Sequence, residues 1–593
     1  MRKFLYLSLF SLSLLLISCK GEVSSATNEL EFVYTTDIHG EFLPYDFLRR
    51  QQDSISMANI YTYVKQAREK DPEGVILLDG GDLIEGTPSM YYYNYEAQRE
   101  QHLSPRIMNF MQYDVLCLGN HDLECGEIIY SDHLKRDYAM PWLAANAIDT
   151  RTGEPMFLPY CMIERKGYRI AVLGLITAET DQWLPRVAIP HLHFISMLDA
   201  ARRWMPIIDE REHPDMIIGL FHAGHESIER RDAEGNVYMD GAFQVLQQVR
   251  GFDLAFIAHD HLNENKVIAN DFGDSICVVQ PLSHAEEFAS VKVSLGTERK
   301  ANNHLSINST VTLNSTKPYL AGEDYLDEVV GYKGRIDQFL DRPVGTVAET
   351  LDAESSLVGP SNLIDLVHAV QLFNTNADIS FVSCLSNFTD IQSGALTMRQ
   401  LFAIYKYENQ VNKIWMYGHE VKKFLEYGVG RQFNQMKSAD DHLLAFKYSP
   451  EGEILMGRFG PELVTPQYNY TQAAGINYIV DVSKPVGQRI TIESMADGRP
   501  FDPNQKYFIA LSSHQASGGG GFLPYGLGWN SEDCDYHSVT ASIKDMRSYI
   551  SEFISRMDAG QMPVLGSWHV EPYEWWMKAK QRDIDLLKPY LKR

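Results

Sequence analysis

Short apolar segments recur between residues 30 and 295, and each ends in a polar loop that often contains glycine or histidine. Several are apolar on both faces, which is typical of strands in a sheet that helices cover on both sides. The predicted strands are Leu30–Thr36, Gly74–Leu78, Asp114–Leu118, Tyr168–Ile176, Asp215–Phe221, Phe252–Ala258 and Ser275–Val279. Residues Ile60–Lys70 and Asp199–Glu212 predict covering helices. The pattern predicts a layered α/β domain in which ligands bind at the carboxyl ends of the strands.

An Asn/Ser/Thr-rich stretch at residues 302–316 marks the end of this first domain, which we place at residues 29–316. Residues 317–342 are charged and compatible with a helix, so we expect a helical connector there. Residues 343–593 carry their own mixture of helical and strand patterns, and they predict a second domain of the α+β class.

The N-terminus has the features of an export signal. The basic residues of Met1–Lys3 precede an apolar run, Phe4–Ile17, that is shorter than the ~20 residues of a membrane-spanning helix. The run leads into Ser18-Cys19, which resembles the bacterial lipobox and predicts a signal peptide at residues 1–19, lipidation of Cys19 and a flexible tether at residues 20–28. An ordinary signal peptide with a chance cysteine is the alternative. We expect a periplasmic or cell-surface lipoprotein that its N-terminal lipid anchors to a bacterial membrane.

The overall charge restricts the class of partner. The chain of 593 residues has 53 Lys and Arg against 78 Asp and Glu, which gives a formal net charge of −25. A nucleic-acid polymer needs a basic surface, so DNA and long RNA are excluded as partners by this balance. Small anions stay possible, because a local cluster of cations can outweigh the surface charge within a cleft.

Five short motifs contain the residue types of a dinuclear metal site, and each follows one of the predicted strands. They are Asp37-Ile38-His39, Gly81-Asp82, Gly119-Asn120-His121-Asp122, His222-Ala223-Gly224-His225 and His259-Asp260-His261. Each alone is weak evidence, but their order along the chain is specific. Nitrogen and oxygen ligands without sulfur suit two divalent ions of Zn, Mn, Fe or Co, and Asp82 is the natural bridge between them. Two such ions turn a bridging water into hydroxide that attacks phosphorus, so the predicted reaction class is phosphoester hydrolysis.

These motifs resemble the calcineurin-like metallophosphoesterases, in the branch of the bacterial 5′-nucleotidases, UDP-sugar hydrolases and 2′,3′-cyclic-nucleotide phosphodiesterases. The resemblance implies a four-layer α/β/β/α metallophosphatase domain followed by an α+β substrate domain of the 5′-nucleotidase type. It also implies that Asp37, His39, Asp82 and His261 hold one metal ion, and that Asp82, Asn120, His222 and His259 hold the other. Asn120 would in addition contact the substrate.

His121 matches the catalytic histidine of the family, which stabilises the transition state and can protonate the leaving oxygen. The family usually places an aspartate three residues later, whereas this chain has Glu124, so we expect a His121–Glu124 pair of slightly altered geometry. The alternative is that Glu124 is a surface acid at a helix start.

The second domain resembles the nucleotide-binding domain of the same branch less evenly. The segment YKYEN suggests that Tyr407 stacks on a base and that Asn409 contacts it, and the glycine loop places Gly519 and Gly520 near the ribose. His514 replaces a second stacking aromatic, Gly520 an aspartate, and Phe388 a phosphate-clamping arginine. Tyr407 as a core aromatic and the glycines as a plain tight turn remain alternatives.

We therefore expect an exported dinuclear-metal hydrolase of nucleotide-type phosphoesters, acting as a 5′-nucleotidase or a 2′,3′-cyclic-nucleotide phosphodiesterase in nucleotide catabolism. Loss of the arginine weakens the case for a phosphate monoester and makes a cyclic diester or a pyrophosphate-linked substrate more plausible. A UDP-sugar or other nucleotide-sugar pyrophosphatase is the alternative within the class. A non-catalytic ligand-binding lipoprotein is the alternative from another class. A monomer is the favoured state.

Overall fold

The computed structural model describes residues 29–225, 228–231, 237–300, 302–385, 390–457, 460–556 and 563–591. The predicted signal peptide and tether, with Cys19, lie outside the described residues, as does Phe388. None of the described helices is long and apolar enough to cross a membrane.

The first domain contains two six-stranded sheets, with the orders β18-β17-β1-β4-β5-β6 and β15-β16-β14-β11-β9-β8. The first sheet consists of β1 (Glu29–Thr35), β4 (Val75–Asp79), β5 (Val115–Cys117), β6 (Trp142–Leu143), β17 (Glu287–Arg299) and β18 (Leu305–Ser315). The second consists of β8 (Tyr160–Arg165), β9 (Tyr168–Ile176), β11 (Met216–His222), β14 (Leu254–Ile257), β15 (Glu264–Ala269) and β16 (Ser275–Gln280). All seven predicted strands are confirmed. The neighbours β1, β4 and β5 pair in parallel, as do β9, β11 and β14.

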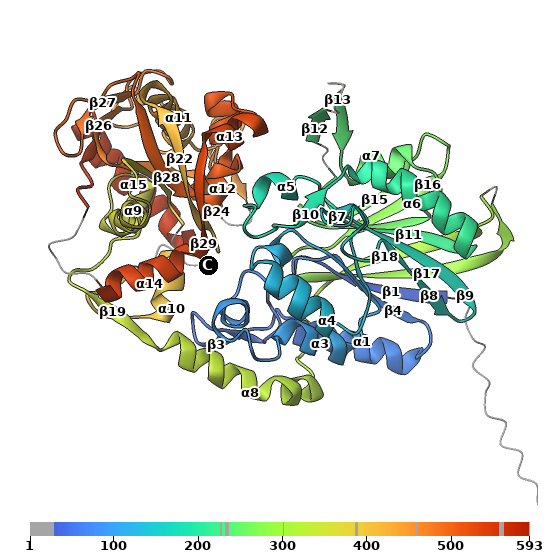
Figure 1. Ribbon diagram of the computed structural model, residues 1–593. Coiled ribbons are helices and arrows are strands. Elements are labelled where there is room, and N and C mark those ends of the chain that lie inside the picture. The colour runs from blue at the N-terminus through green and yellow to red at the C-terminus, as the bar shows by residue number, and fades with distance from the viewer. Residues whose placement is uncertain are drawn as a thin grey trace, which may run out of the picture.

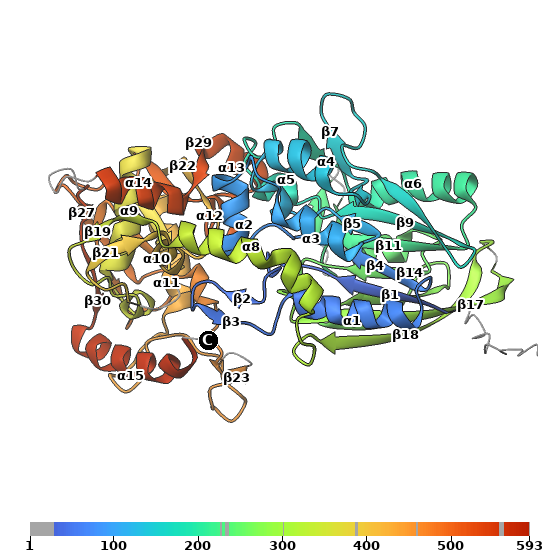
Figure 2. The same cartoon turned by 90° about the horizontal axis from the view of Figure 1, so that it is seen from below.

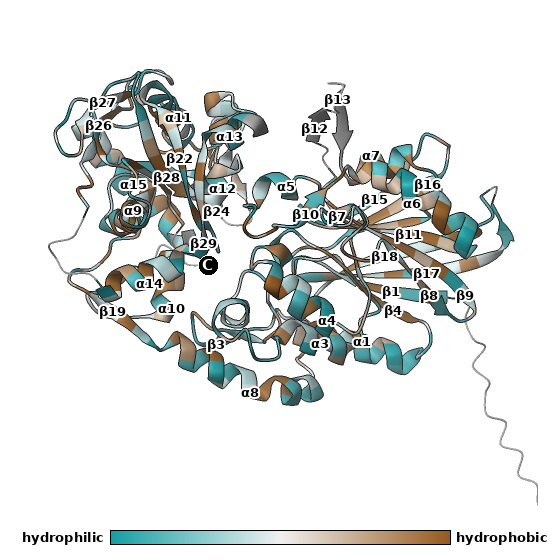
Figure 3. Cartoon of the chain, viewed as in Figure 1, coloured by the Kyte–Doolittle hydropathy of each residue, from teal (hydrophilic) through white to brown (hydrophobic). Residues whose placement is uncertain are grey.

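The two sheets pack face to face, and helices cover both outer faces (Figure 1). Alternate residues of β1 and β4, such as Phe32 and Leu78, point into one core between the sheets, together with Val172 of β9. Helices α1 (Met57–Lys70) and α3 (Leu103–Met111) pack on the first sheet, and α6 (Met197–Glu212) and α7 (Ala242–Gln248) pack on the second. Hydrophobic residues run along the strands, while the helices carry many hydrophilic ones (Figure 3). The predicted α/β/β/α layering is therefore confirmed.

Most of the polar stretch at residues 302–316 forms β18, an edge strand of the first sheet. This strand pairs with β17 in antiparallel register, for example Val311 opposite Val291. Ile307, Val311 and Leu313 pack on the core between the sheets, while the Asn, Ser and Thr side chains alternate with them. This alternation of apolar and polar side chains is that of a half-exposed strand.

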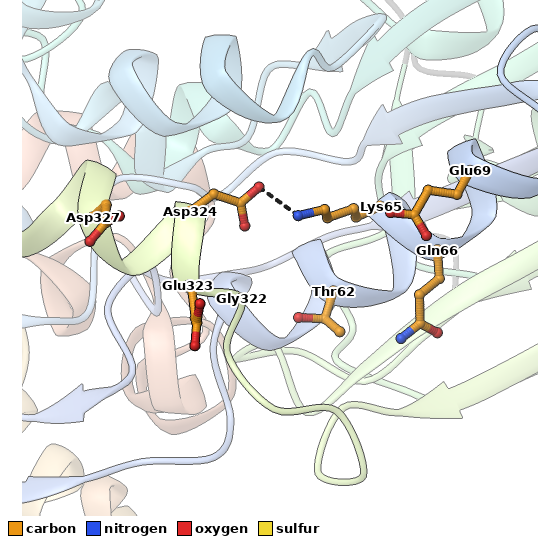
Figure 4. A pocket seen from close by; sticks show the side chains of 8 residues that line it. All are labelled: Thr62, Lys65, Gln66, Glu69, Gly322, Glu323, Asp324 and Asp327. Carbon is orange, nitrogen blue, oxygen red and sulfur yellow. Dashed lines mark hydrogen bonds and ion pairs between the residues drawn. The ribbon is translucent and has the colours of Figure 1, made fainter.

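Helix α8 (Glu323–Leu340) runs between the two domains, and Figure 2 shows it lying across their junction. It packs on α1, where Asp324 forms an ion pair of 2.9 Å with Lys65 and accepts a hydrogen bond of 2.7 Å from the Tyr61 hydroxyl. A shallow pocket between α1 and α8 has mostly polar and charged walls (Figure 4). Tyr325 and Ile336 are buried on the inner face of α8.

The second domain is built on a five-stranded sheet of order β25-β20-β28-β22-β29. Its strands are β20 (Ile379–Ser383), β22 (Gln410–Tyr417), β25 (Thr471–Ala474), β28 (Lys506–Ser512) and β29 (Ser538–Asp545). The helices are α9 (Asn362–Thr375), α10 (Met398–Ile404), α11 (Gly418–Gln432), α12 (Ser513–Ala516), α13 (Ser531–His537), α14 (Met546–Arg556) and α15 (Tyr573–Leu591). A smaller sheet has the order β27-β26-β30, with β26 (Ile476–Asp481), β27 (Ile490–Met495) and β30 (Trp568–Glu571). The mixture of helices and mostly antiparallel strands confirms the α+β class.

The two domains contact each other through buried polar groups. The hydroxyl of Tyr91, which ends α2 (Pro88–Tyr91) in the first domain, lies 3.2 Å from Asp545 Oδ1 and 2.9 Å from Ser548 Oγ. The guanidinium of Arg547 lies over the Tyr91 ring, 4.5 Å from its centroid, and forms an ion pair with Asp545. These contacts hold the second domain against α2, in the segment that follows β4.

Candidate metal centre and active site

The predicted metal ligands lie where strands of both sheets end. Asp37 comes two residues after β1, Asp82 three after β4 and Asn120 three after β5. In the second sheet, His222 is the last residue of β11, and His259 comes two residues after β14. Because these strands are parallel within each sheet, their carboxyl ends meet at one edge and bring the side chains together.

One group of side chains contains Asp37, His39, Asp82 and His261. His261 Nε2 lies 3.1 Å from His39 Nε2 and 3.3 Å from Asp37 Oδ1. Asp37, His39 and Asp82 can each offer one ligand atom within 4.8 Å of the others. These distances are short enough for one ion to be bound by all of them.

A second group shares Asp82 with the first. His222 Nε2 lies 3.1 Å from Asp82 Oδ2 and 3.1 Å from Asn120 Oδ1. The ligand atoms of Asp82, His222 and His259 also lie within 4.8 Å of one another. The described residues thus form two groups of ligands joined by one carboxylate, which is the donor set of a dinuclear centre.

The carboxylate of Asp82 has the character of a metal ligand. Its Oδ2 atom is buried and accepts no well-aligned hydrogen bond from any described residue. A buried carboxylate oxygen without such a partner is destabilising unless a cation binds it. The donor set therefore fits two divalent ions.

The charges of this pocket favour a cation. Burial raises the pKa of Asp37 and of Asp82, but the neighbouring His261 and His222 lower both by more, so both carboxyls stay charged. Burial lowers the pKa of His222, yet the charge of Asp82 outweighs this and raises it to about 9. Because Asp37 and Asp82 stay negatively charged and their charge draws a proton to His222, this pocket attracts cations.

The backbone of the ligand loops is strained. Five of the seven predicted ligands have positive φ angles: Asp37 (49°), His39 (48°), Asp82 (57°), His259 (79°) and His261 (56°). Each such residue costs on the order of 1 kcal/mol or more and persists only where its surroundings fix it. Here the Asp37 amide donates to the Gly81 carbonyl, and the His39 amide to the Asp82 carbonyl, each at 2.9 Å. These hydrogen bonds tie the loop after β1 to the loop after β4, and so they hold ligands from different strands in one place despite the strained backbone.

Two partners orient the imidazoles, and sequence reasoning missed both. Glu85 Oε2 lies 3.1 Å from His39 Nδ1, and the Gly80 carbonyl lies 2.7 Å from His222 Nδ1. Each contact directs the Nε2 atom toward the centre, as partners of metal-binding histidines commonly do. The only hint in the sequence is that Gly80 and Glu85 lie close to Asp82.

Asp122 of the third motif holds the ligand loops together through their backbone. Its carboxylate accepts backbone hydrogen bonds of 2.8 to 3.2 Å from Asp82, Leu83, Ile84 and Gly119. His225 instead contacts Asp260, with Nδ1 3.2 Å from Oδ2. The indole of Trp183 stacks on His259, with 5.1 Å between ring centroids, a contact with no signal in the sequence.

His121 and Glu124 form a pair beside this centre. Nδ1 of His121 lies 2.8 Å from Glu124 Oε1, and the His121 amide donates to Asp82 Oδ1 at 2.8 Å. Burial lowers the pKa of His121, but the charges of Glu124 and Asp82 raise it well above its usual value. The imidazole is therefore a proton donor adjacent to the shared carboxylate.

The predicted substrate residues of the second domain lie in two places on its surface. Tyr407 packs edge-on against Tyr468, which sequence reasoning missed, with 6.3 Å between centroids. Burial and Tyr468 raise the pKa of Tyr407 to about 12, and the charge of Glu85 in the first domain adds to this. Asn409 Nδ2 donates to the Tyr405 hydroxyl at 3.4 Å.

The glycine loop packs against His514. A Cβ atom on Gly519 would lie 2.3 Å from His514 Cε1, so a side chain there would displace the imidazole. Gly520 has φ of 71°, and its carbonyl accepts a hydrogen bond of 2.9 Å from Arg431. Burial and the charge of His121 in the first domain lower the pKa of His514. Arg431 is a cation that sequence reasoning missed.

Two family models match the chain. Calcineurin-like phosphoesterase matches residues 30–263, and the 5′-nucleotidase C-terminal domain matches residues 343–525. The first domain thus matches the calcineurin-like phosphoesterases. Members of this family use a dinuclear metal centre, and the described residues include the candidate ligand groups for one.

Relatives of this metal-dependent phosphoesterase match either nearly its whole length or a part of it. It is 24% identical to the 2′,3′-cyclic-nucleotide 2′-phosphodiesterase/3′-nucleotidase of Yersinia enterocolitica, over 93% of this chain and 88% of that protein. It is 28% identical to a 5′-nucleotidase of Vibrio cholerae, over 40% of this chain and 41% of the relative. The structure of a 5′-nucleotidase precursor from Thermus thermophilus has the same fold, with a TM-score of 0.57, 18% identity, and coverage of 91% of this chain and 99% of that one.

Proposed function

We propose that this phosphoesterase hydrolyses nucleotide-type phosphoesters, as a 5′-nucleotidase or a 2′,3′-cyclic-nucleotide phosphodiesterase. The observation that carries the proposal is the sharing of Asp82 between two ligand groups, with His121 bonded to the same carboxylate. The names of the relatives from Yersinia enterocolitica and Vibrio cholerae support the substrate class. A purely binding role is disfavoured, because every predicted ligand and the His121–Glu124 pair are present.

The predicted ligands would hold one ion through Asp37, His39, Asp82 and His261, and a second through Asp82, Asn120, His222 and His259. Bound divalent ions would polarise the phosphoryl group and make water a nucleophile at neutral pH. The nitrogen and oxygen donors suit Zn, Mn, Fe or Co.

His121 supplies the proton for the leaving oxygen in this proposal. Glu124 lies against Nδ1 and stabilises the protonated ring, so that Nε2 can donate. The buried position of Glu124 raises its own pKa, and the charge of His121 opposes that increase. The proton between His121 and Glu124 therefore lies where solvent reaches the two side chains only in part.

The second domain would bind the nucleoside part of the substrate. Tyr407 and Tyr468 offer aromatic faces, and Asn409, His514 and the Gly519–Gly520 backbone offer polar groups. Aromatic stacking tolerates different bases, which suits an enzyme with more than one nucleotide substrate. Arg431 places a cation beside the glycine loop.

A substrate panel tests the proposal. Purified protein with added Mn²⁺ or Zn²⁺ is assayed on AMP, 2′,3′-cyclic AMP, UDP-glucose and bis(p-nitrophenyl) phosphate. We expect turnover of AMP or the cyclic nucleotide. Turnover of UDP-glucose alone would make the protein a nucleotide-sugar pyrophosphatase, and no turnover of any compound would contradict the proposal.

We also propose that Cys19 is lipidated and anchors an exported, monomeric enzyme to a bacterial membrane. The support is the basic start, the short apolar run and the Ser18-Cys19 junction. In cells fed radiolabelled palmitate, the wild-type protein should be labelled and fractionate with membranes, whereas Cys19→Ala should be unlabelled. Labelling of both proteins alike would refute the assignment of Cys19.

A further inference from the structure

A third imidazole lies beside the first group of ligands. His284 follows β16, in the loop that leads into β17, and its ring centroid lies 4.8 Å from that of His39 and 5.8 Å from that of His261. The ligand atoms of His39, His261 and His284 all lie within 4.8 Å of one another. The three rings are therefore close enough to bind one ion together.

The backbone fixes His284 in this place. Its amide donates a hydrogen bond of 2.7 Å to the Asp37 carbonyl, so its loop is tied to the first ligand loop. His284 (φ 55°) and the buried Ala285 (φ 54°) both have positive φ angles. Five of the seven predicted ligands share this rare conformation. Strain of this kind on non-glycine residues gathers where function requires a fixed side chain.

The ring of His284 has no competing partner. It is exposed, and neither of its nitrogens forms a hydrogen bond or ion pair with any described residue. His39 is bonded to Glu85 through Nδ1, and its Nε2 faces His261. His284 thus adds free nitrogen donors on the same side of the centre as those two rings.

We propose that His284 is an additional protein ligand of the first metal ion, alongside Asp37, His39, Asp82 and His261. The inference rests on the proposed dinuclear function. A third imidazole makes this site richer in nitrogen than the second site, which draws on Asp82, Asn120, His222 and His259. Imidazole favours Zn and Fe, whereas carboxylate and water suit Mn, so His284 biases the first site toward Zn.

Zinc binding by purified wild type and His284→Ala, in competition with a chelator, tests this. We expect the zinc affinity of one site to fall at least ~10-fold in the variant, because even indirect partners of metal ligands contribute that much. The other site should keep its affinity, and manganese affinity should fall less than zinc affinity. The absorption spectrum of the cobalt-loaded protein should also change, since it reports the ligands directly.

Two further variants sharpen the experiment. His193→Ala removes an exposed histidine of the same domain that pairs with Asp181, and it should leave both zinc affinities unchanged. His284→Asp supplies a different ligand and should restore part of the affinity, which would exclude misfolding as the cause. Unchanged zinc affinity and an unchanged cobalt spectrum in His284→Ala would overturn the proposal, even if turnover fell.

The outcome is separable from that of the substrate panel. If wild type binds two ions and hydrolyses nucleotides while His284→Ala binds zinc normally, only the role of His284 fails. If wild type binds two ions but hydrolyses nothing, the proposed function fails, and the zinc and cobalt measurements still decide the role of His284.

Discussion

His121 Nδ1 lies 2.8 Å from Glu124 Oε1, while the backbone amide of His121 is bonded to Asp82, the carboxylate shared by both ligand groups. The predicted proton donor, His121, is thus hydrogen-bonded through its own backbone to Asp82, the predicted bridge between the two metal ions. The extra methylene of glutamate is accommodated because His121–Leu123 forms a 3-10 turn that brings residues 121 and 124 to the same side.

Removing either member of this pair should slow the chemical step. We expect His121→Ala to lower kcat by ~10²- to 10⁴-fold with metal content retained, as loss of a general acid does. Glu124→Gln should lower kcat less, and Glu124→Asp less still. The control Glu127→Gln alters a nearby acid that pairs with His191, and it should leave kcat unchanged. Unchanged kcat in His121→Ala would remove this residue from the mechanism.

Truncating Tyr407 should weaken nucleotide binding without slowing a substrate that lacks a base. Base stacking is worth ~1 to 3 kcal/mol, so Tyr407→Ala should raise KM for AMP or cyclic AMP by ~10-fold or more. The kcat/KM for bis(p-nitrophenyl) phosphate should stay constant. Tyr448→Ala, at an exposed tyrosine of the same domain, is the control. An equal loss on both substrates would show that Tyr407 supports the fold instead.

The domain contact should depend on Arg547 and little on Glu408. Arg547 is buried, 2.9 Å from Asp545 and 3.2 Å from Glu408. Burial raises the pKa of Glu408 well above its usual value, with Arg547 opposing this, so Glu408 gives up its proton less readily than an ordinary glutamate. Arg547→Met removes the cation beside the buried Asp545 and should cost ~3 to 5 kcal/mol of unfolding free energy. Glu408→Gln should cost clearly less, and equal losses in urea unfolding would show that Glu408 matters as much to this contact as Arg547.

A buried histidine away from the site should make stability depend on pH. His304 Nδ1 lies 2.8 Å from Asp253 Oδ2, and Nε2 lies 3.2 Å from Asp209 Oδ1. Burial lowers the pKa of His304, but these carboxylates raise it above its ordinary value. A raised pKa in the folded state stabilises the fold fully below the unfolded pKa of ~6.5 and loses this contribution as pH rises through the folded value.

His304→Gln should therefore lower the Tm more at pH ~6 than at pH ~9 relative to wild type. Thermal unfolding of both proteins across this range measures the difference. His419→Gln, at a residue in the second domain whose Nδ1 faces the Pro503 carbonyl, should show no such trend. A deficit of the same size at both ends of the range would argue against a charged His304.

The metallophosphatase fold could be predicted from sequence because its strands are continuous apolar runs. Tyr168–Ile176 was predicted with the bounds that β9 has, and the ligand motifs follow such strands directly. β18 could not be predicted in the same way, since only its alternate side chains are apolar and it contains no continuous apolar run.

The metal ligands could be predicted from sequence because the residue types and spacing of their motifs are unusual. The residues that contact these ligands could not be predicted in this way. Glu85 lies close to Asp82 in sequence but belongs to no motif, and His284 lies outside every motif, so only the fold shows that both reach His39. Tyr468 and Arg431 lie far in sequence from Tyr407 and Gly520, which they contact. Long-range packing determines such partners, and a lone histidine or tyrosine in a sequence carries no sign of it.

Metal content per chain, in wild type and Asp82→Ala, tests the central claim most directly. Asp82 belongs to both ligand groups, so its loss should empty both sites, whereas Asp37→Ala should empty one. After loading and gel filtration, we predict about two ions per chain for wild type and close to none for Asp82→Ala. Wild type that holds fewer than two ions, or Asp82→Ala that keeps both, would contradict a dinuclear centre bridged by Asp82.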